Sequence, residues 1–318
     1  MTLKNTTDRF YLLFICLAFI CLIIGLGSYG LAESSEARYA EISREMFLSG
    51  DYLNPQLLGI FHFHKPPITY YITSLGYKIF GINEFGARFF LQVAIVIQLL
   101  LIYGLAHLLF RSRKIAFLSG LIYFSMPIVL ISSRNLTTDA YLTTFIMAAI
   151  FSWQYYISNK KLPFLYLFYI LLGLSLLTKG PVALLFVLVY IFTYKIICKS
   201  GFKINTHHVF GVLICLTIGA SWFLLLVVEN PKLWDYFIEK QIAGRMTGSS
   251  FSERAKPFWY FIPIIFGLLL PWLVGSIPTF KFKLKSLYKT KNQSLVLLIS
   301  SSLLILLFSV FRTKLILY

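Results

Sequence analysis

The residues whose types could carry chemistry lie between the long apolar stretches of the chain, where acids and bases alternate at close spacing. In the segment 32–88, Lys65 directly precedes Pro66 and Pro67. Because proline fixes the local backbone, we expect Lys65 to be held in place against a membrane surface, where a lysine can bind a lipid phosphate. The competing interpretation is a lysine that only extends to the lipid head groups.

Other charges of the same segment lie on an expected amphipathic helix that begins near Ser34, a residue type that favours helix starts. Arg38, Glu41 and Glu45 are three and four residues apart and share one face, and apolar residues share another. This pattern predicts a helix at the membrane surface. Its charged face could contribute to a site, or it could be a solvated set of ion pairs.

His62 and His64 flank a phenylalanine in an H-x-H pattern. In an extended chain both imidazoles point to the same face, so His62 and His64 are candidate ligands of a divalent metal, which is the one candidate cofactor. Two ligands alone do not make a metal site.

Two short turns place ionisable groups at the ends of apolar stretches. Asp139 opens one stretch, and Lys179 lies in the tight turn Thr178–Pro181. An ionisable group at membrane depth is costly, so a partner or substrate is the expected explanation. The structural alternative makes Asp139 a helix N-cap and places Lys179 on the carbonyl groups of a helix end.

These residues must be positioned by membrane helices. The chain has 318 residues, 58% hydrophobic and only 13% charged, with a mean hydropathy of +0.78, which excludes a soluble enzyme. Stretches of about 20 apolar residues predict an all-α polytopic membrane protein with about nine transmembrane helices. They lie near 10–31, 88–110, 115–133, 139–157, 163–178, 180–197, 208–228, 258–279 and 293–311.

The charges indicate the orientation of these helices. The apolar segment Pro66–Gly81 is about 24 Å long as a helix, too short to span, and is expected to lie in the membrane plane. One side of the membrane then has 15 basic residues and one acid, and the other has 14 basic and 11 acidic residues. The positive-inside rule places the basic side, with the N-terminus, in the cytoplasm. The net charge of +17 is therefore an orientation signal and implies no nucleic-acid partner.

Several motifs together resemble one family. In chain order they are Glu36–Met46, Ser49–Tyr52, Lys65–Pro67, Thr178–Pro181 and Pro257–Pro263. The combination, which covers nearly the whole chain, resembles the bacterial aminoarabinose-transferase-like glycosyltransferases. These enzymes depend on polyprenyl phosphate, are related to the protein O-mannosyltransferases, and belong to the GT-C class of polytopic enzymes.

The resemblance implies a glycosyltransferase that moves a sugar from a polyprenyl-phosphate carrier to an acceptor, which could be lipid A, a glycan or a protein. It places the enzyme in the bacterial cytoplasmic membrane among membrane lipids, with its active site on the outer side. By family, the two acidic positions of the active cavity fall at Ser35 or Glu36 and at Asp139, so Glu36 and Asp139 are the candidate catalytic residues; Arg38 and Lys65 match the residues that handle the carrier phosphate. Lys179 lies in the family's Thr-Lys-Gly-Pro turn and is expected to assist the phosphate.

The chain departs from the family pattern at three places. Ser35 stands where the aminoarabinose transferases have the first acid of an Asp-Glu pair, and His64 replaces a glutamate before Lys-Pro. Lys240 and Gln241 stand where the family often has Glu-His, which weakens a metal site. The chain also stops inside a family motif, so residues 1–318 are expected to form a C-terminally truncated transmembrane domain. Its outer loops are expected at 32–88, which has the in-plane helices, and at 229–257.

The mechanism expected from these residues is an inverting transfer, in which the acceptor attacks the anomeric carbon and the polyprenyl phosphate leaves. A hydroxyl acceptor needs a carboxylate base, either Asp139 or Glu36, whereas a phosphate acceptor needs none. The alternatives are a non-catalytic family member, disabled by the change at Ser35 or by truncation, and a transporter or flippase for a lipid-linked sugar. Transporters usually place ionisable residues near the middle of the membrane, and the expected spans here are nearly free of charge.

Overall fold

The chain folds into helices that fall into two compact units. The computed structural model describes residues 5–32, 34–198, 204–243, 256–269, 272–275, 292–311 and 314. Unit 1 consists of Met1–Ser125, Val129–Ala183 and Asn205–Leu224, and unit 2 of Met126–Ile128, Leu184–Ile204 and Leu225–Tyr318. The helices of unit 1 are α1 (Thr6–Ile23), α2 (Ser35–Ser49), α3 (Ile68–Phe80), α4 (Glu84–Phe110), α5 (Arg113–Phe124), most of α6 (Pro127–Ser133), α7 (Thr138–Asn159), α8 (Leu162–Lys179) and the larger part of α10 (Thr206–Glu229).

Contacts at both ends show that α1 and α4 run antiparallel. At the start of α1, the buried Asp8 carboxylate accepts a hydrogen bond from Tyr103, near the end of α4, and pairs with Arg113 at the start of α5. At the other end, Arg88 near the start of α4 donates to the carbonyl groups of Leu26 and Tyr29, just after α1. The segment between α1 and α4 therefore begins and ends at the same end of unit 1.

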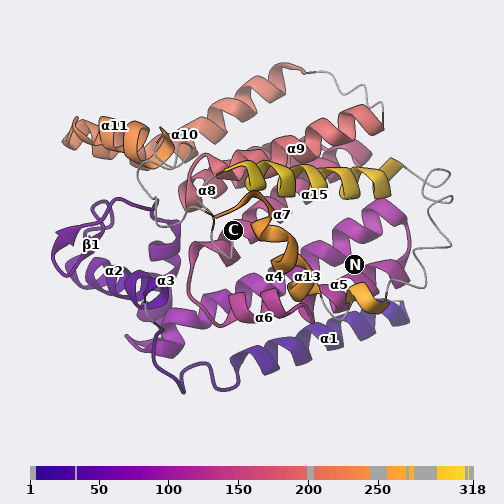
Figure 1. Ribbon diagram of the computed structural model, residues 1–318, viewed down its shortest axis with the longest axis horizontal. Coiled ribbons are helices and arrows are strands. Elements are labelled where there is room, and N and C mark those ends of the chain that lie inside the picture. The colour runs from indigo at the N-terminus through magenta and orange to yellow at the C-terminus, as the bar shows by residue number, and fades with distance from the viewer. Residues whose placement is uncertain are drawn as a thin grey trace. The chain divides into compact units, whose positions relative to one another are not determined.

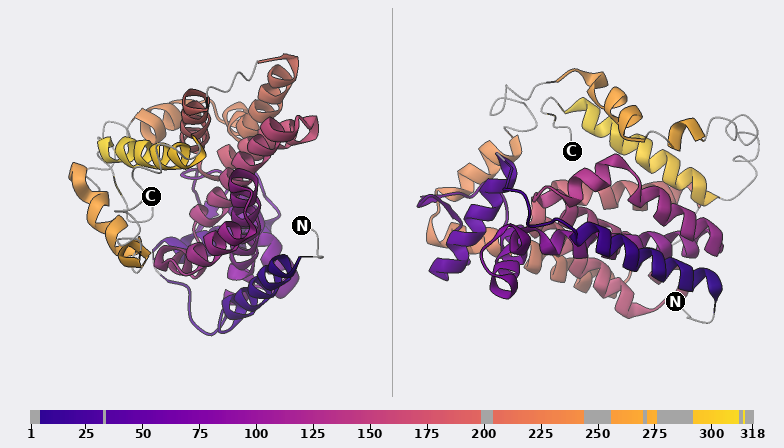
Figure 2. Two further views of the ribbon diagram at one scale, coloured as in Figure 1. Left: turned by 90° about the vertical axis from the view of Figure 1, so that its right-hand side faces the viewer. Right: turned by 90° about the horizontal axis from the view of Figure 1, so that it is seen from below.

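That segment contains α2, a β-hairpin and α3, and Figure 1 shows them grouped at the end of unit 1 away from the N-terminus, as does the view from below in Figure 2. The expected short helix α3 has 13 residues, and Leu75 and Ile79, one turn apart, form an exposed apolar face. These features support the prediction that α3 does not span. The N-cap of α2 is Ser34, as expected, but its side chain makes no capping hydrogen bond.

The hairpin was not expected from the sequence. Strand β1 (Gln56–Leu57) pairs antiparallel with β2 (Ile60–Phe61) through a two-residue turn at Leu58 and Gly59. Both turn residues have positive φ angles, 52° and 75°. Such turns are usually signalled by Asn-Gly or Asp-Gly, and a leucine in this conformation gives no such signal.

Polar and small residues join the helices of unit 1, as is typical of helices in membranes. The buried Gln98 amide of α4 donates to the Ala140 carbonyl and to Thr144 of α7, and its oxygen accepts from Tyr123 of α5. Where α3 meets α4, the backbones approach so closely that a methyl group on Gly76 would collide with the Gly86 carbonyl oxygen.

Unit 2 has fewer described contacts. Besides most of α9 (Val182–Ile197), its helices are the short α11 (Leu233–Asp235), a π-helical segment η1 (Tyr236–Ala243), a 3-10 turn η3 (Phe258–Tyr260), α13 (Phe261–Leu269) and α15 (Asn292–Val310). The rings of Phe186 and Phe308 pack 5.3 Å apart, and the buried Lys314 ammonium donates to the Lys256 carbonyl.

In the described part of the chain, five helices are long and apolar enough to cross a membrane: α1, α4, α8, α10 and α15. The expected span 115–133 is not straight, because α5 and α6 are bent by 62° where Pro127 begins α6; taken together they would be a sixth span. The other expected stretches coincide with α7, with the shorter α9 and with α13, although residues 270–271 and 276–279 of the stretch 258–279 lie outside the described residues. The total of nine spans stays a prediction.

Replacing Gly76 by alanine should destabilise unit 1, because the added methyl group must separate α3 from α4. We expect a loss of about 1–3 kcal/mol. Gly267→Ala in α13 is the matched control, because a methyl group there meets nothing within 4 Å. Thermal unfolding of both variants in detergent checks the prediction, and equal midpoints for the two would contradict it.

Candidate functional site

Arg88 is the buried centre of the end of unit 1 that contains α2 and α3. Its guanidinium group is fully buried and forms two hydrogen bonds of 2.8 Å with the Glu36 carboxylate. It also donates to the carbonyl groups of Leu26, Tyr29 and Gly30, and lies 3.9 Å from the centre of the Tyr29 ring. The sequence reasoning missed Arg88, although an arginine next to a long apolar stretch could have signalled it.

Glu36 is occupied by these structural contacts. Its side chain is 1% exposed, and besides Arg88 its oxygens accept hydrogen bonds from the amides of Ala32 (2.8 Å) and Leu136 (3.0 Å). Burial by itself raises the pKa of the Glu36 carboxyl, but the Arg88 guanidinium and the two amides outweigh burial, and the pKa is lowered. Glu36 is therefore held as a carboxylate.

The hydrogen bond between the Leu136 amide and Glu36 joins the two parts of the chain that contain the candidate site residues Arg38 and Asp139. Arg38 lies two residues after Glu36 on α2, and Asp139 lies three residues after Leu136 at the start of α7. Ala40, two residues after Arg38, and Ala140, next to Asp139, belong to one buried apolar cluster that also includes residues of α3 and α4. The packing and this hydrogen bond therefore fix the backbone of α2 around Arg38 and the start of α7 around Asp139.

Asp139 and Lys179, expected separately, form an ion pair. The Lys179 side chain is 7% exposed and that of Asp139 is 26% exposed, so the carboxylate keeps access from outside. The N-cap of α7 is Thr137, whose hydroxyl accepts from the Asp139 amide, and the Asp139 side chain is not the cap. Lys179 is the last residue of α8. The pair therefore links the start of α7 to the end of α8 and neutralises both charges.

A second group of polar residues gathers where the hairpin leads into α3. The rings of His62 and His64 lie 4.2 Å apart, and His64 is exposed while His62, Lys65 and Arg38 are half-buried. Burial lowers the pKa of His62 to about 4, and the nearby charges of His64, Arg38 and Lys65 add to this effect. At neutral pH His62 is thus uncharged beside the basic side chains of Arg38 and Lys65, and the group can bind an anion.

The two histidines alone do not complete a metal site. A catalytic zinc needs three protein ligands and a structural one needs four. Among the residues that the structure describes, no group of three or more His, Cys, Asp or Glu side chains could hold a metal ion. The side chains of Lys240 and Gln241, at the family's Glu-His position, and the stretch 244–255 of the late loop lie outside the described residues. The role of His62 and His64 as metal ligands stays a prediction.

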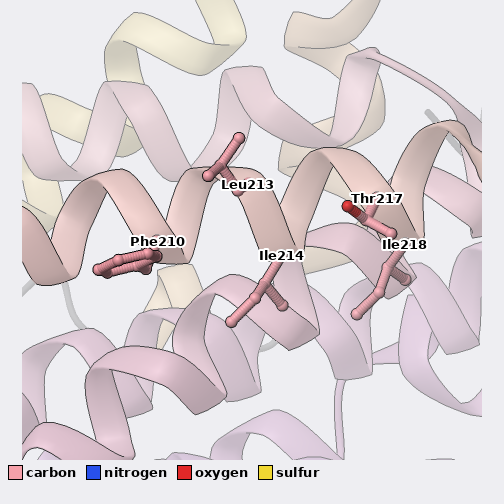
Figure 3. Close-up of a pocket in the computed structure, with 5 residues that line it drawn as sticks. All are labelled: Phe210, Leu213, Ile214, Thr217 and Ile218. Atoms are coloured by element: carbon pink, nitrogen blue, oxygen red, sulfur yellow. The ribbon is translucent and has the colours of Figure 1, made fainter.

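A pocket of about 290 Å³ lies along α10 in unit 1, and Figure 3 shows the five side chains that line it. Its lining has four apolar side chains, and Thr217 supplies the polar one; the full set is Phe210, Leu213, Ile214, Thr217 and Ile218. This lining suits hydrocarbon and lacks the cations or carboxylates that phosphate or sugar chemistry requires.

Comparisons with known proteins point in one direction. The sequence model of the dolichyl-phosphate-mannose-protein mannosyltransferase family matches residues 9–237. The chain is 32% identical over 281 residues to undecaprenyl phosphate-alpha-4-amino-4-deoxy-L-arabinose arabinosyl transferase 2 of Proteus mirabilis (87% of this chain and 50% of that protein). It is 33% identical over 304 residues to the transferase of the same description from Aeromonas hydrophila (93% and 54%). The chain spans about half the length of these relatives.

A solved structure has the same fold. The crystal structure of ArnT from Cupriavidus metallidurans bound to undecaprenyl phosphate superposes with a TM-score of 0.86 at 27% identity, covering 99% of this chain and 57% of that one. The apo form of the same protein gives a TM-score of 0.84. This likeness confirms the expected fold, an all-α polytopic membrane protein of the GT-C type.

Replacing Glu36 by glutamine should destabilise the protein, because Arg88 would become a buried charge without a counter-charge. We expect a loss of about 3 kcal/mol. Glu41→Gln is the matched control on the same helix, because it breaks the more exposed pair of Glu41 with Arg44 and should cost less than about 1 kcal/mol.

Thermal unfolding in detergent at pH 7 measures the difference between these two variants. The wild-type protein should also lose stability as the pH falls below the ordinary value of 4.5 for a glutamate, because a lowered pKa favours folding only while Glu36 is ionised. Glu36→Gln should lack that loss. Equal unfolding midpoints for the two variants at pH 7 would show that the buried pair does not support the fold.

Proposed function

Because the chain belongs to the dolichyl-phosphate-mannose-protein mannosyltransferase family, we propose that it transfers a sugar from a polyprenyl-phosphate carrier to an acceptor at the membrane. The observation that carries the proposal is the pair of cations, Arg38 and Lys65, gathered around His62 on a frame that also holds Asp139. Relatives described as undecaprenyl phosphate-aminoarabinose transferases, and a similar structure bound to undecaprenyl phosphate, support this donor class.

In this proposal, Arg38 and Lys65 bind the carrier phosphate. The guanidinium group can donate two parallel hydrogen bonds to phosphate oxygens, and the lysine adds a point charge. Both side chains are half-buried, so water competes less for these hydrogen bonds than at a fully exposed site. As the bond between the anomeric carbon and the phosphate oxygen breaks, the electron pair stays on the phosphate, and the two cations stabilise the negative charge.

Asp139 serves as the general base when the acceptor is a hydroxyl group. The acceptor oxygen forms the new bond to the anomeric carbon from the side opposite the phosphate, and its proton passes to the Asp139 carboxylate. We assign this role to Asp139 instead of Glu36, because Asp139 is partly exposed whereas Glu36 is buried against Arg88. Lys179 pairs with Asp139 and fixes its position, and Glu36 acts as a positioning residue.

The membrane side and the acceptor belong to the same proposal. The basic loops support a cytoplasmic N-terminus, which places Arg38, Lys65 and Asp139 on the outer face of a bacterial cytoplasmic membrane. An acceptor hydroxyl on a sugar, lipid A or a protein would use Asp139. A phosphate acceptor is already ionised, so its transfer would not need Asp139 as a base.

Single substitutions of the phosphate-binding residues test the donor. We expect Arg38→Ala and Lys65→Ala to lower transfer from a polyprenyl-phosphate sugar about 10- to 100-fold, the effect of losing a charge-assisted hydrogen bond of about 1.5–3 kcal/mol. Arg44→Ala, on the same helix as Arg38 but paired with Glu41, should transfer at the wild-type rate. The assay uses membranes that contain the full-length protein.

Asp139→Asn tests the base, since the amide keeps the shape of the side chain but cannot take the acceptor proton. We expect transfer to fall at least about 100-fold. Because Lys179 then loses the counter-charge of Asp139, the variant should also unfold at a lower temperature, so transfer is measured below its own unfolding midpoint. Lipid analysis of the same membranes would identify the modified acceptor by its mass. Wild-type rates from the Arg38, Lys65 and Asp139 variants together would rule out the proposed site, whereas no transfer by the wild-type protein itself would favour a non-catalytic member of the family.

A further inference from the structure

The β1–β2 hairpin has apolar side chains that the rest of the chain leaves uncovered. Leu58 at the turn is 77% exposed, Ile60 is 72% exposed and Phe61 is 59% exposed. Three large apolar side chains within four residues are unusual on a surface that faces water. Some of the other exposed apolar side chains, for example Leu213 on α10, lie on helices apolar enough to span a membrane.

The contacts of the hairpin tie it to α10, a helix long and apolar enough to cross a membrane. The indole N–H of Trp222 on α10 donates to the Leu53 carbonyl at 2.9 Å, and the Trp222 ring lies 6.5 Å from the ring of Phe63. Leu53 and Phe63 flank the hairpin on either side, so both of its ends are fixed at the level of Trp222.

That level can be estimated from the length of α10. The helix has 24 residues, or about 36 Å, against a hydrocarbon core of about 30 Å. Trp222 lies seven residues before the last residue, Glu229, which is about 10 Å along the helix. Even if all of the excess length extended beyond this end of the core, Trp222 would lie about 4 Å inside it. The hairpin therefore starts within the hydrocarbon boundary of one leaflet.

The backbone of the hairpin suits such an environment, where polar groups need partners within the protein. The amides of Leu58 and Gly59, at the tip, donate to the Glu45 carboxylate at 2.6 and 3.3 Å. The two strands pair with each other, and the His62 amide donates to the Pro55 carbonyl. The tip can therefore present its apolar side chains to lipid with its turn amides already bonded.

We propose that the β1–β2 hairpin inserts into the leaflet on the side of the segment 32–88, with Leu58, Ile60 and Phe61 among the phospholipid acyl chains at their boundary with the head groups. The insertion does not depend on the transfer reaction. If the proposed function holds, a further consequence follows, because β2 continues directly into His62–Lys65. The hairpin would then set the depth at which Lys65 meets the carrier phosphate.

Spin labels at positions 58 and 60 test the insertion. Leu58→Cys and Ile60→Cys are made in a background in which the four native cysteines are replaced by alanine, and each protein is reconstituted into vesicles of phosphatidylethanolamine and phosphatidylglycerol. Collisions of the nitroxide with oxygen, which concentrates in lipid, are compared with collisions with a water-soluble nickel chelate. Leu213→Cys, 54% exposed on α10, is the lipid control, and Lys161→Cys, exposed between α7 and α8, is the water control.

We expect both hairpin labels to collide with oxygen in preference to the nickel chelate, with a ratio close to that of the Leu213 label. A ratio close to that of the Lys161 label would overturn the proposal, because the hairpin would then lie in water. Few collisions with either reagent would overturn it as well, because another part of the protein or a second copy would then cover the tip. Both positions are exposed and are labelled separately, so a variant that fails to fold leaves the other as the test.

Discussion

The end of unit 1 that carries the candidate site depends on the buried ion pair between Arg88 and Glu36. Separating such a pair is costly, because either charge alone would be left without a partner in a medium of low dielectric. The pair also satisfies the carbonyl groups that follow α1 and the amide that precedes α7. Three parts of the chain that are far apart in sequence, residues 26–36, Arg88 and Leu136, therefore meet at one guanidinium group and one carboxylate.

The residues proposed to bind the carrier phosphate and to take the acceptor proton are carried by these segments, but they do not belong to the ion pair. Arg38 lies one helical half-turn beyond Glu36, and Asp139 follows Leu136, whose amide the same carboxylate binds. Both oxygens of the Glu36 carboxylate already accept hydrogen bonds, so Glu36 is a poor base, but it holds the segments around it in place. The structure thereby separates the two acids that the sequence offered for catalysis: Glu36 is the one that is buried, and Asp139 is the one that remains accessible.

The same arrangement, a charge held by a specific partner, occurs at other helix ends of unit 1. Asp139 pairs with Lys179, and Asp8 is held by Tyr103 and Arg113. Charges at membrane depth are tolerated in this way because each is neutralised within the protein. Between helices, neutral polar groups such as Gln98 form hydrogen bonds that join one helix to the next. Such bonds matter because lipid provides no hydrophobic force to bring the helices together.

The sequence by itself determined the membrane class, the location of most helices and the residue types of the site. Hydropathy, the distribution of lysine and arginine, and proline positions are local patterns, and they identified Lys65, Asp139 and Lys179 as candidates. Only the tertiary structure decided that Glu36 faces Arg88, 52 residues away, that Asp139 faces Lys179, and that Leu58 and Gly59 form a turn clasped by Glu45. A contact between residues far apart in the chain produces no repeating pattern in the sequence, so it cannot be read from local spacing. The role of a carboxylate depends on the group that it contacts, and only the tertiary structure supplies that group.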